Sequence, residues 1–319
     1  MKPLGYVGFD TSNYTTSAAL CDAEGRVLAN IRIPLPVKEG ERGLRQSDAV
    51  FAHVKNLPQV CEALREAVAE VDVMAVGCSV SPRSAEGSYM PCFMAGRVAA
   101  EAFAASLNIP VRTFSHQDGH IMAALYSSGA VDALMQAPFG AFHVSGGTTE
   151  MVLAIPNGHG FTVELLGGSA DLHAGQAIDR IGVMMGLRFP CGKELEKLAA
   201  QNTKKIPVPK ISVKEGECHL SGLENLARKL WEDTHDAPLV SAYVLEFCGR
   251  TLKKMTEWMD HLYPEIPIVY GGGVMSNRYL QGVLSERKNT YFAAPEFSAD
   301  NAAGIALLTR RFELTRKGE

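Results

Sequence analysis

The sequence lacks the short motifs that mark several common classes of protein. No Cys-x-x-Cys pair occurs among its seven widely spaced cysteines, so we expect reduced thiols, as in a cytoplasmic protein. Neither a P-loop nor a Gly-x-Gly-x-x-Gly fingerprint is present. The longest apolar stretch, residues 90–105, contains charged residues and is too short to span a bilayer. No signal peptide is expected at the amino terminus.

The chain also lacks an excess of positive charge. Its 319 residues carry a formal net charge of -4, which argues against a protein that binds nucleic acid through its overall field. Any contact with RNA is therefore expected from a local patch or from a partner. Basic residues gather in the loop 204–214 and again near residues 310–317, where solvated faces are the simpler interpretation.

The order of predicted elements repeats along the chain. Strands are predicted at residues 4–9, 15–21 and 26–33, and a second set of three at 139–144, 150–155 and 161–166. Helices and further strands follow each set. This pattern predicts a duplicated α/β protein with halves at 1–137 and 138–319 and a ligand in the cleft between them. The last helix, about residues 300–319, is expected to pack back on the first half. A single irregular α/β domain is the alternative.

Three glycine-rich turns follow predicted strands, at residues 7–12, 144–149 and 270–274. Such turns let backbone N–H groups approach phosphate oxygens, although each one alone is also typical of a hairpin. Asp171 stands at the start of a predicted helix and Asp179 on its body, and both carboxylates could bind ribose hydroxyls. They could equally complement the helix dipole or lie on a solvated face.

Two histidines, His116 and His120, lie four residues apart. On a helix they would share one face and could bind a single metal ion, for which a third ligand is required. Two surface histidines near the start of a helix are the alternative. Asp300 precedes the last predicted helix, where N-capping would by itself explain an aspartate.

Taken together, these motifs resemble the TsaD family, formerly called glycoproteases or O-sialoglycoprotein endopeptidases. The resemblance rests on six motifs that occur in order along the chain: His116-x-x-x-His120, Val144-Ser145-Gly146-Gly147, Asp171 to Asp179, Pro190-Cys191-Gly192, Gly272-Gly273-Val274-x-x-Asn277-Arg278 and Pro295-Glu296-x-x-x-Asp300-Asn301. It implies the actin-like ATPase and sugar-kinase fold, built from two ribonuclease-H-like halves. It further implies transfer of a threonylcarbamoyl group from an adenylate to N6 of an adenosine beside the anticodon of tRNA.

The resemblance also implies the residues of the site. His116, His120 and Asp300 would hold one divalent metal ion, iron or zinc, and Asp10 and Asp118 are the predicted catalytic carboxylates. An adenylate-type donor, ATP or AMP is the expected ligand. The predicted nucleotide-binding positions are Val144, Ser145, Gly146, Gly147, Thr148, Asp179, Gly192 and Asn277. Expected partners are tRNA, a metal-free homologue and a small ATPase, and a dimer is a further possibility.

Several positions depart from the family pattern. An acidic pair is usual where this chain has Asn13-Tyr14-Thr15, and a glycine-rich stretch is replaced by Ser81-Pro82-Arg83-Ser84. Thr148 replaces a histidine and Glu224 replaces a lysine. The nucleotide and metal motifs are thus better preserved than those facing the acceptor. A divergent transferase is the first hypothesis, a non-catalytic nucleotide-binding paralogue the second, and a metalloprotease the third, although no His-Glu-x-x-His is present.

Overall fold

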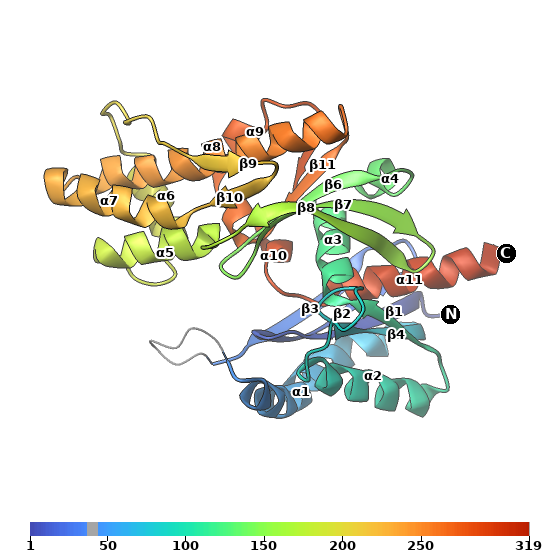
Figure 1. The fold of residues 1–319 in the computed structure, drawn as a ribbon. Helices are drawn as coiled ribbons and strands as arrows, with labels where there is room; N and C mark the ends of the chain where they lie inside the picture. Colours follow the sequence, from blue (N-terminus) through green and yellow to red (C-terminus); the bar gives the residue numbers. More distant parts are fainter. Residues whose placement is uncertain (37–43, 319) are drawn as a thin grey trace. The chain divides into compact units, whose positions relative to one another are not determined.

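The computed structural model describes residues 1–36 and 44–318. The chain divides into two compact units (Figure 1). The first contains Met1–Val131, Pro156–Thr162 and Ala299–Glu319, and the second contains Asp132–Ile155 and Val163–Ser298. The domain boundary expected at residue 137 stays a prediction.

The first unit is built on a sheet of five strands in the order β3-β2-β1-β4-β5. Its strands are β1 (Leu4–Thr11), β2 (Thr15–Asp22), β3 (Val27–Pro34), β4 (Asp72–Ser81) and β5 (Val111–Ser115). The first three strands form an antiparallel meander, and β4 and β5 run parallel to β1. The carboxyl ends of β1, β4 and β5 therefore share one edge of the sheet.

Helices cover both faces of this sheet (Figure 1). They are α1 (Gln46–Ala69), α2 (Phe93–Leu107), α3 (His116–Ser127) and α11 (Ala303–Gly318). Val7 and Phe9 on β1 join the apolar core that includes residues of α1 and α2. The intervening Gly8 faces α11, where an added Cβ would lie 2.5 Å from the backbone nitrogen of Ala306. The absence of a side chain at Gly8 thus lets the last helix pack directly on the first strand.

The second unit repeats the strand order of the first. Its sheet runs β12-β11-β6-β7-β8-β10-β9, with β6 (Phe139–Val144), β7 (Thr149–Asn157), β8 (Gly160–Ser169), β9 (Ser212–Lys214), β10 (Glu217–His219), β11 (Ile268–Gly271) and β12 (Thr290–Phe292). The meander β6-β7-β8 corresponds to β1-β2-β3, and the parallel strands β11 and β12 correspond to β4 and β5. The short hairpin β9-β10 extends the second sheet and was not predicted from the sequence.

Helices of the second unit surround a core in which α8 is buried along most of its length. They are α5 (Ala174–Met184), α6 (Gly192–Ala199), α7 (Ser221–Thr234), α8 (Ala237–Leu262), the 3-10 turn η1 (Gly273–Ser276), α9 (Arg278–Leu284) and α10 (Pro295–Ser298). The short α4 (Val131–Leu134) lies where the chain passes from the first unit to the second.

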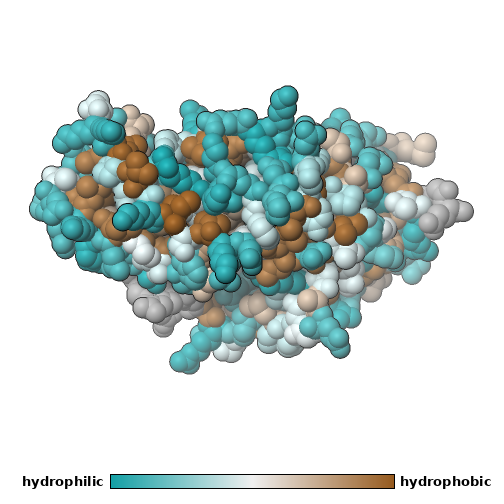
Figure 2. Space-filling model, turned by 45° about the horizontal axis from the view of Figure 1, so that its top comes forward, coloured by the Kyte–Doolittle hydropathy of each residue, from teal (hydrophilic) through white to brown (hydrophobic). Residues whose placement is uncertain are grey.

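The face drawn in Figure 2 is largely hydrophilic, with hydrophobic residues in scattered patches. Among the described residues, no helix combines the length and apolar character needed to cross a membrane.

Candidate functional site

The carboxyl end of β1 carries a row of buried polar side chains. The hydroxyl of Thr11 donates to the carbonyl of Cys92 and accepts from the N–H of Gly96, both at 2.9 Å, which fixes the strand end against α2. Asp10 is 1% exposed. Its Oδ1 accepts hydrogen bonds from Ser79 and from Nδ1 of His116, the latter at 2.9 Å. Its Oδ2 is buried without a hydrogen-bond partner in the described part of the chain.

The start of α3 places His116 and His120 on one side of the helix. Ser115 and Asp118 form a capping box that begins the helix at His116. The two histidines are one turn apart, and their Nε2 atoms lie 2.9 Å from each other. Both rings therefore direct a nitrogen toward the same point, as the four-residue spacing predicts.

Asp300, just before α11, completes this group. Its Oδ1 lies 3.2 Å from Nε2 of His120 and 3.7 Å from Nε2 of His116, and its Oδ2 accepts a hydrogen bond of 2.8 Å from Ser12. One ligand atom from each of the three residues lies within 4.8 Å of the others. The structure thus brings together the three residues predicted as metal ligands.

The surroundings of these three residues fit a metal ion. Because a carboxylate only accepts, Nδ1 of His116 must carry the proton that it shares with Asp10, which leaves the lone pair on Nε2 for a ligand bond. This tautomer is assigned from the hydrogen bonds. Two imidazoles and one carboxylate suit a divalent transition metal with open positions. The group His116, His120 and Asp300 could therefore hold one metal ion.

The charges around the two histidines favour a cation. Burial by itself lowers the pKa of His116, but the carboxylates of Asp10 and Asp300 outweigh it and raise that pKa to about 9. Burial likewise opposes ionisation of Asp300, yet the hydrogen bond and positive charge of the histidines hold its pKa well below the usual range. In the metal-free protein a proton on His116 occupies the place that a metal ion would take, so the two compete.

His53 on α1 supports this site and was missed in the sequence. It is fully buried, with Nδ1 2.8 Å from Oγ1 of Thr16 and Nε2 2.8 Å from the carbonyl of Ser12. Since the carbonyl only accepts, Nε2 donates and Nδ1 accepts from Thr16. Burial lowers the pKa of His53 and keeps it neutral. The ring thus fixes the backbone of Ser12, whose hydroxyl holds Asp300; a lone polar residue among helical apolar positions was the only sequence signal.

Asp118, which was predicted to be catalytic, belongs to the capping box at the start of α3. Its carboxylate is 3% exposed and accepts from Ser115, from Oγ of Ser84 at 3.0 Å and from the N–H of Phe161 at 3.2 Å. Burial raises its pKa, while these donors oppose the rise. Two residues from each histidine, it lies on the opposite side of the helix from them. A catalytic role for Asp118 remains a prediction, and its contacts are those of a structural cap.

In the second unit, the predicted nucleotide-binding residues Val144, Ser145, Gly146, Gly147 and Thr148 form the turn between β6 and β7. The N–H of Ser145 donates to the carbonyl of Thr148 at 2.7 Å, and the N–H of Gly175 donates to the carbonyl of Ser145 at 3.1 Å. A Cβ on Gly146 or Gly147 would meet no atom within 4 Å. The turn therefore has a fixed backbone and an open side.

Two close approaches bring further elements to this turn. An added Cβ on Gly175, in the first turn of α5, would lie 2.7 Å from the backbone nitrogen of Gly146. Gly272 has a φ of +93°, and a Cβ there would overlap the carbonyl of Val144. Glycine is thus required at both positions, and its absence of a side chain brings α5 and η1 against the end of β6.

The remaining predicted nucleotide-binding residues hold neighbouring helices. Asp179 on α5 accepts a hydrogen bond of 2.7 Å from the N–H of Cys191, which sets the start of α6 at Gly192. Asn277 is 9% exposed and caps α9 through the N–H of Leu280. The structure joins Asp179 to Gly192 through Cys191, and the β6–β7 turn to η1 through Gly272.

Asp171 serves a different helix from the one expected. It was predicted to lie at the start of α5, but its carboxylate accepts from the N–H groups of Leu220 and Ser221 and from the Ser221 hydroxyl, at 2.5–3.3 Å. Although burial raises the pKa of Asp171, these donors lower it to about 2. The residue therefore anchors the first turn of α7, which lies far along the sequence.

Comparison with known families decides the membership of the chain. The sequence profile of the TsaD family, described as tRNA N6-adenosine threonylcarbamoyltransferase, matches residues 27–307. The chain belongs to the TsaD family. The resemblance predicted from its motifs is therefore confirmed over most of its length.

Solved structures confirm the predicted fold class. The activator of 2-hydroxyisocaproyl-CoA dehydratase from Clostridium difficile, with bound ADPNP, is 11% identical with a TM-score of 0.54, covering 99% of this chain and 98% of that one. HypF of T. kodakarensis is 12% identical with a TM-score of 0.61, and the match covers 98% of this chain but 48% of that one. A ROK family glucokinase from Streptomyces griseus, in complex with glucose and AMPPNP, is 14% identical with a TM-score of 0.50, covering 98% and 100%. These likenesses show the actin-like ATPase and sugar-kinase fold.

Proposed function

We propose that this TsaD family protein is a metal-dependent transferase. It moves a threonylcarbamoyl, or a related carbamoyl, group from an adenylate to N6 of an adenosine next to the anticodon of tRNA. The observation that carries this proposal is the convergence of His116, His120 and Asp300 on one point, within a chain matched by the family profile. We place the reaction in the cytoplasm, with a metal-free homologue and a small ATPase as partners.

The first unit supplies the metal-binding side chains. His116, His120 and Asp300 would hold one ion, iron or zinc, with Asp10 fixing the His116 tautomer and Ser12 orienting Asp300. When bound, the ion supplies Lewis-acid stabilisation of negative charge. Asp10 then acts as a positioning residue, because its Oδ1 is already engaged by His116 and Ser79. The transfer reaction needs no covalent intermediate with the protein.

The second unit supplies the nucleotide-binding backbone. The open side of Gly146 and Gly147, with Gly192 at the start of α6, offers N–H groups that a phosphate can approach closely. Binding of ADPNP and AMPPNP by structural neighbours supports an adenosine nucleotide as the ligand. In the reaction, N6 of adenosine attacks the carbonyl carbon of the mixed anhydride, a C–N bond forms, and the C–O bond to phosphate breaks. The amine loses a proton, AMP leaves, and the N–H groups offset charge on the departing phosphate.

A second candidate function is a nucleotide-binding paralogue without catalysis. The turn after β1 favours it, because Asn13 accepts a hydrogen bond of 2.7 Å from Gln46 and Tyr14 is 43% exposed. No carboxylate stands at residues 13–15 to assist loss of the amine proton. The metalloprotease alternative has less support, since the acid between the two histidines, Asp118, caps α3.

One set of measurements separates these functions. The purified full chain is assayed for metal content, for nucleotide binding by thermal shift, and for transfer of labelled threonylcarbamoyl from its adenylate to tRNA, alone and with candidate partners. The transferase predicts about one metal ion per chain, stabilisation by adenosine nucleotides and label in tRNA that requires His116. A ligand at 100 times its Kd should stabilise the chain by about 2.7 kcal/mol. Nucleotide binding without transfer under every condition would favour the paralogue.

A further inference from the structure

One stretch of the second unit is basic although the chain as a whole is acidic. Residues 180–214 contain eight lysines and arginines and two acidic residues, in a protein whose formal net charge is -4. The stretch runs from α5 through α6 to β9. Positive charge is thus concentrated locally, which is the pattern required of an RNA-binding surface on an acidic protein.

Within this stretch, three exposed basic residues lie on α6 or in the loop before it and form no ion pair among the described residues. Arg180 and Lys204 each pair with an acid, Glu224 and Asp236 respectively. By contrast, no ion pair forms within the described ranges at Arg188, Lys193 or Lys197, which are all exposed. These cations are therefore free to contact an anionic partner.

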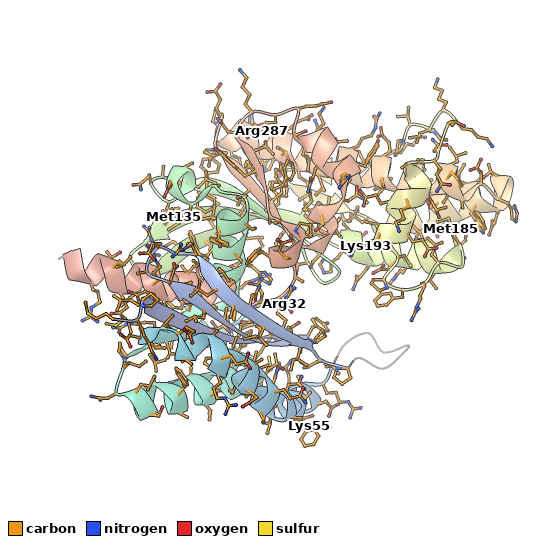
Figure 3. All side chains as sticks on the ribbon, turned by 180° about the vertical axis from the view of Figure 1, so that it is seen from behind. Arg32, Lys55, Met135, Met185, Lys193 and Arg287 are labelled. Atoms are coloured by element: carbon orange, nitrogen blue, oxygen red, sulfur yellow. The ribbon has the colours of Figure 1, made fainter. Side chains whose placement is uncertain are left out.

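Lys193 and Lys197 lie one turn apart on α6 and share its outer side. Leu195 between them is fully buried, which fixes the orientation of the helix. Glu196 is turned to another contact, since its carboxylate accepts from the N–H of Arg278 at 2.7 Å. Figure 3 labels Met185 and Lys193, which bracket the loop between α5 and α6.

That loop carries an exposed aromatic ring next to Arg188. Phe189 is 69% exposed and directly follows Arg188 in the sequence. The loop itself is anchored, because Cys191 is fully buried and its N–H donates to Asp179. Because its ring stays in water, Phe189 contributes little hydrophobic free energy to folding. With Arg188 before it in sequence and Lys193 and Lys197 following on α6, the ring matches the combination of base stacking and phosphate contact by which proteins bind single-stranded nucleic acid.

We infer that Arg188, Phe189, Lys193 and Lys197 form a surface that binds a single-stranded segment of RNA. Phe189 stacks on a base, and the three cations contact neighbouring phosphates. The inference rests on the proposed function, in which the acceptor lies in the unpaired loop of a tRNA. This RNA-binding surface adjoins Gly192, one of the predicted nucleotide-binding positions, so donor and acceptor would meet on the same unit. An acidic protein could pair with the three cations but would not explain the exposed ring of Phe189.

The experiment measures equilibrium binding and needs no transfer. Fluorescence anisotropy follows binding of the full chain to a labelled, unmodified tRNA at several salt concentrations, without adenylate. A Lys193→Gln, Lys197→Gln variant should lower the magnitude of the slope of log affinity against log salt by about 1.4, or about 0.7 per phosphate contact. Phe189→Ala should weaken binding by about 5- to 150-fold, whereas Phe189→Tyr should keep it.

A matched control removes two lysines elsewhere in the second unit. Lys253 and Lys254 on α8 are exposed and paired with Glu286 and Glu257. Their replacement by Gln should leave the salt slope unchanged. Tryptophan fluorescence of every variant, measured in parallel, should equal that of the wild type and so exclude unfolding as the cause of weaker binding, because Trp231 and Trp258 both lie in the second unit.

The outcomes distinguish this surface from the proposed function. Wild-type binding with an unchanged slope in the Lys193, Lys197 variant would overturn the RNA-binding surface and leave the transferase standing. RNA binding that depends on the surface, without transfer, would count against the transferase alone. Polyglutamate is also tested as a competitor. If it displaces the tRNA as effectively as excess unlabelled RNA does, and Phe189→Ala has no effect, the surface binds acidic proteins and the RNA-binding proposal is overturned. Absence of RNA binding by the wild type would overturn the RNA-binding surface, whereas the transfer assay with candidate partners decides the proposed function.

Discussion

The turns after β1 and after β6 occupy corresponding places in two sheets of the same strand order, but they are built in opposite ways. After β1, side chains do the binding: Asp10 holds His116, and Ser12 holds Asp300. After β6, the chain places glycines with an open side. One fold thus supports a side-chain site in one half and a backbone site in the other.

The difference teaches where each site is vulnerable. In the first unit a substitution changes charge or removes a ligand, and the effect is chemical. In the second unit a substitution adds atoms, and the effect is steric. Substitutions in the first turn should therefore lower metal content, whereas substitutions in the second should lower nucleotide affinity or the stability of the fold.

The largest effect is expected from Asp300→Ala in the first unit. This change removes the one carboxylate of the predicted ligand set, so metal content should fall from about one ion per chain to near zero. Transfer activity should drop by more than about 100-fold, beyond what loss of an outer hydrogen-bond partner causes. Elemental analysis and the tRNA assay measure the two effects.

Asp233→Ala is the matched control for that change, because Asp233 is an exposed aspartate on α7. It should retain both metal and activity. Full activity of Asp300→Ala without metal would end the metal-dependent proposal.

A steric pair tests the second unit. Gly272→Ala should destabilise the protein by about 2 kcal/mol or more, since the new Cβ would overlap the carbonyl of Val144 at a positive φ. Gly147→Ala adds the same methyl group to open space and should fold normally while weakening nucleotide binding. Denaturation and thermal-shift titrations separate the two. Equal nucleotide affinity in Gly147→Ala and wild type would show that the open side of the turn is not a binding surface.

Asp10→Asn tests the support behind the metal ligands. Loss of the carboxylate charge should weaken metal binding by about 10- to 100-fold and let the pKa of His116 fall from about 9 toward its ordinary value. In the wild type, metal affinity should therefore rise with pH up to about 9, as His116 loses its proton. In the variant the rise should level off at lower pH. Metal titrations between pH 6 and 9 measure this, and identical profiles would contradict the role of Asp10.

The sequence allowed the fold and two of the three metal ligands to be anticipated, because the duplication is repeated along the chain and the two histidines are local. His116 and His120 share a helical turn, and two meanders with the same spacing imply a duplication. The resemblance to the family supplied Asp300, which lies far from the histidines in sequence and which spacing alone could not pair with them.

The supporting contacts could not be anticipated because they depend on packing. His53 reaches Ser12 only after α1 folds across the sheet. Asp171 looked like a residue of α5, yet its donors are on α7, some fifty residues on. A sequence pattern shows which residue types stand near a helix start, but not which helix the tertiary fold brings to them.

Asp171→Asn gives the smallest expected effect and sharpens the contrast, since this carboxylate in the second unit is structural. At pH 7 the variant should lose about 1 kcal/mol of stability, as for loss of a helix cap. The folded pKa of about 2 lies below the ordinary 3.8, so the carboxylate stabilises the protein fully above pH 4 and less as the pH falls toward 2. The gap between wild type and variant should close over that range.

Tryptophan fluorescence during urea unfolding can follow this gap in the second unit, because both tryptophans, Trp231 and Trp258, lie on α7 and α8. A gap that stays constant from pH 7 to pH 2 would mean that the charge of Asp171 does not anchor α7. Metal content should be unaffected at neutral pH, since Asp171 contacts Leu220, Ser221 and His219 rather than His116 or His120. A loss of metal in this variant would contradict the division into a side-chain site and a separate backbone site.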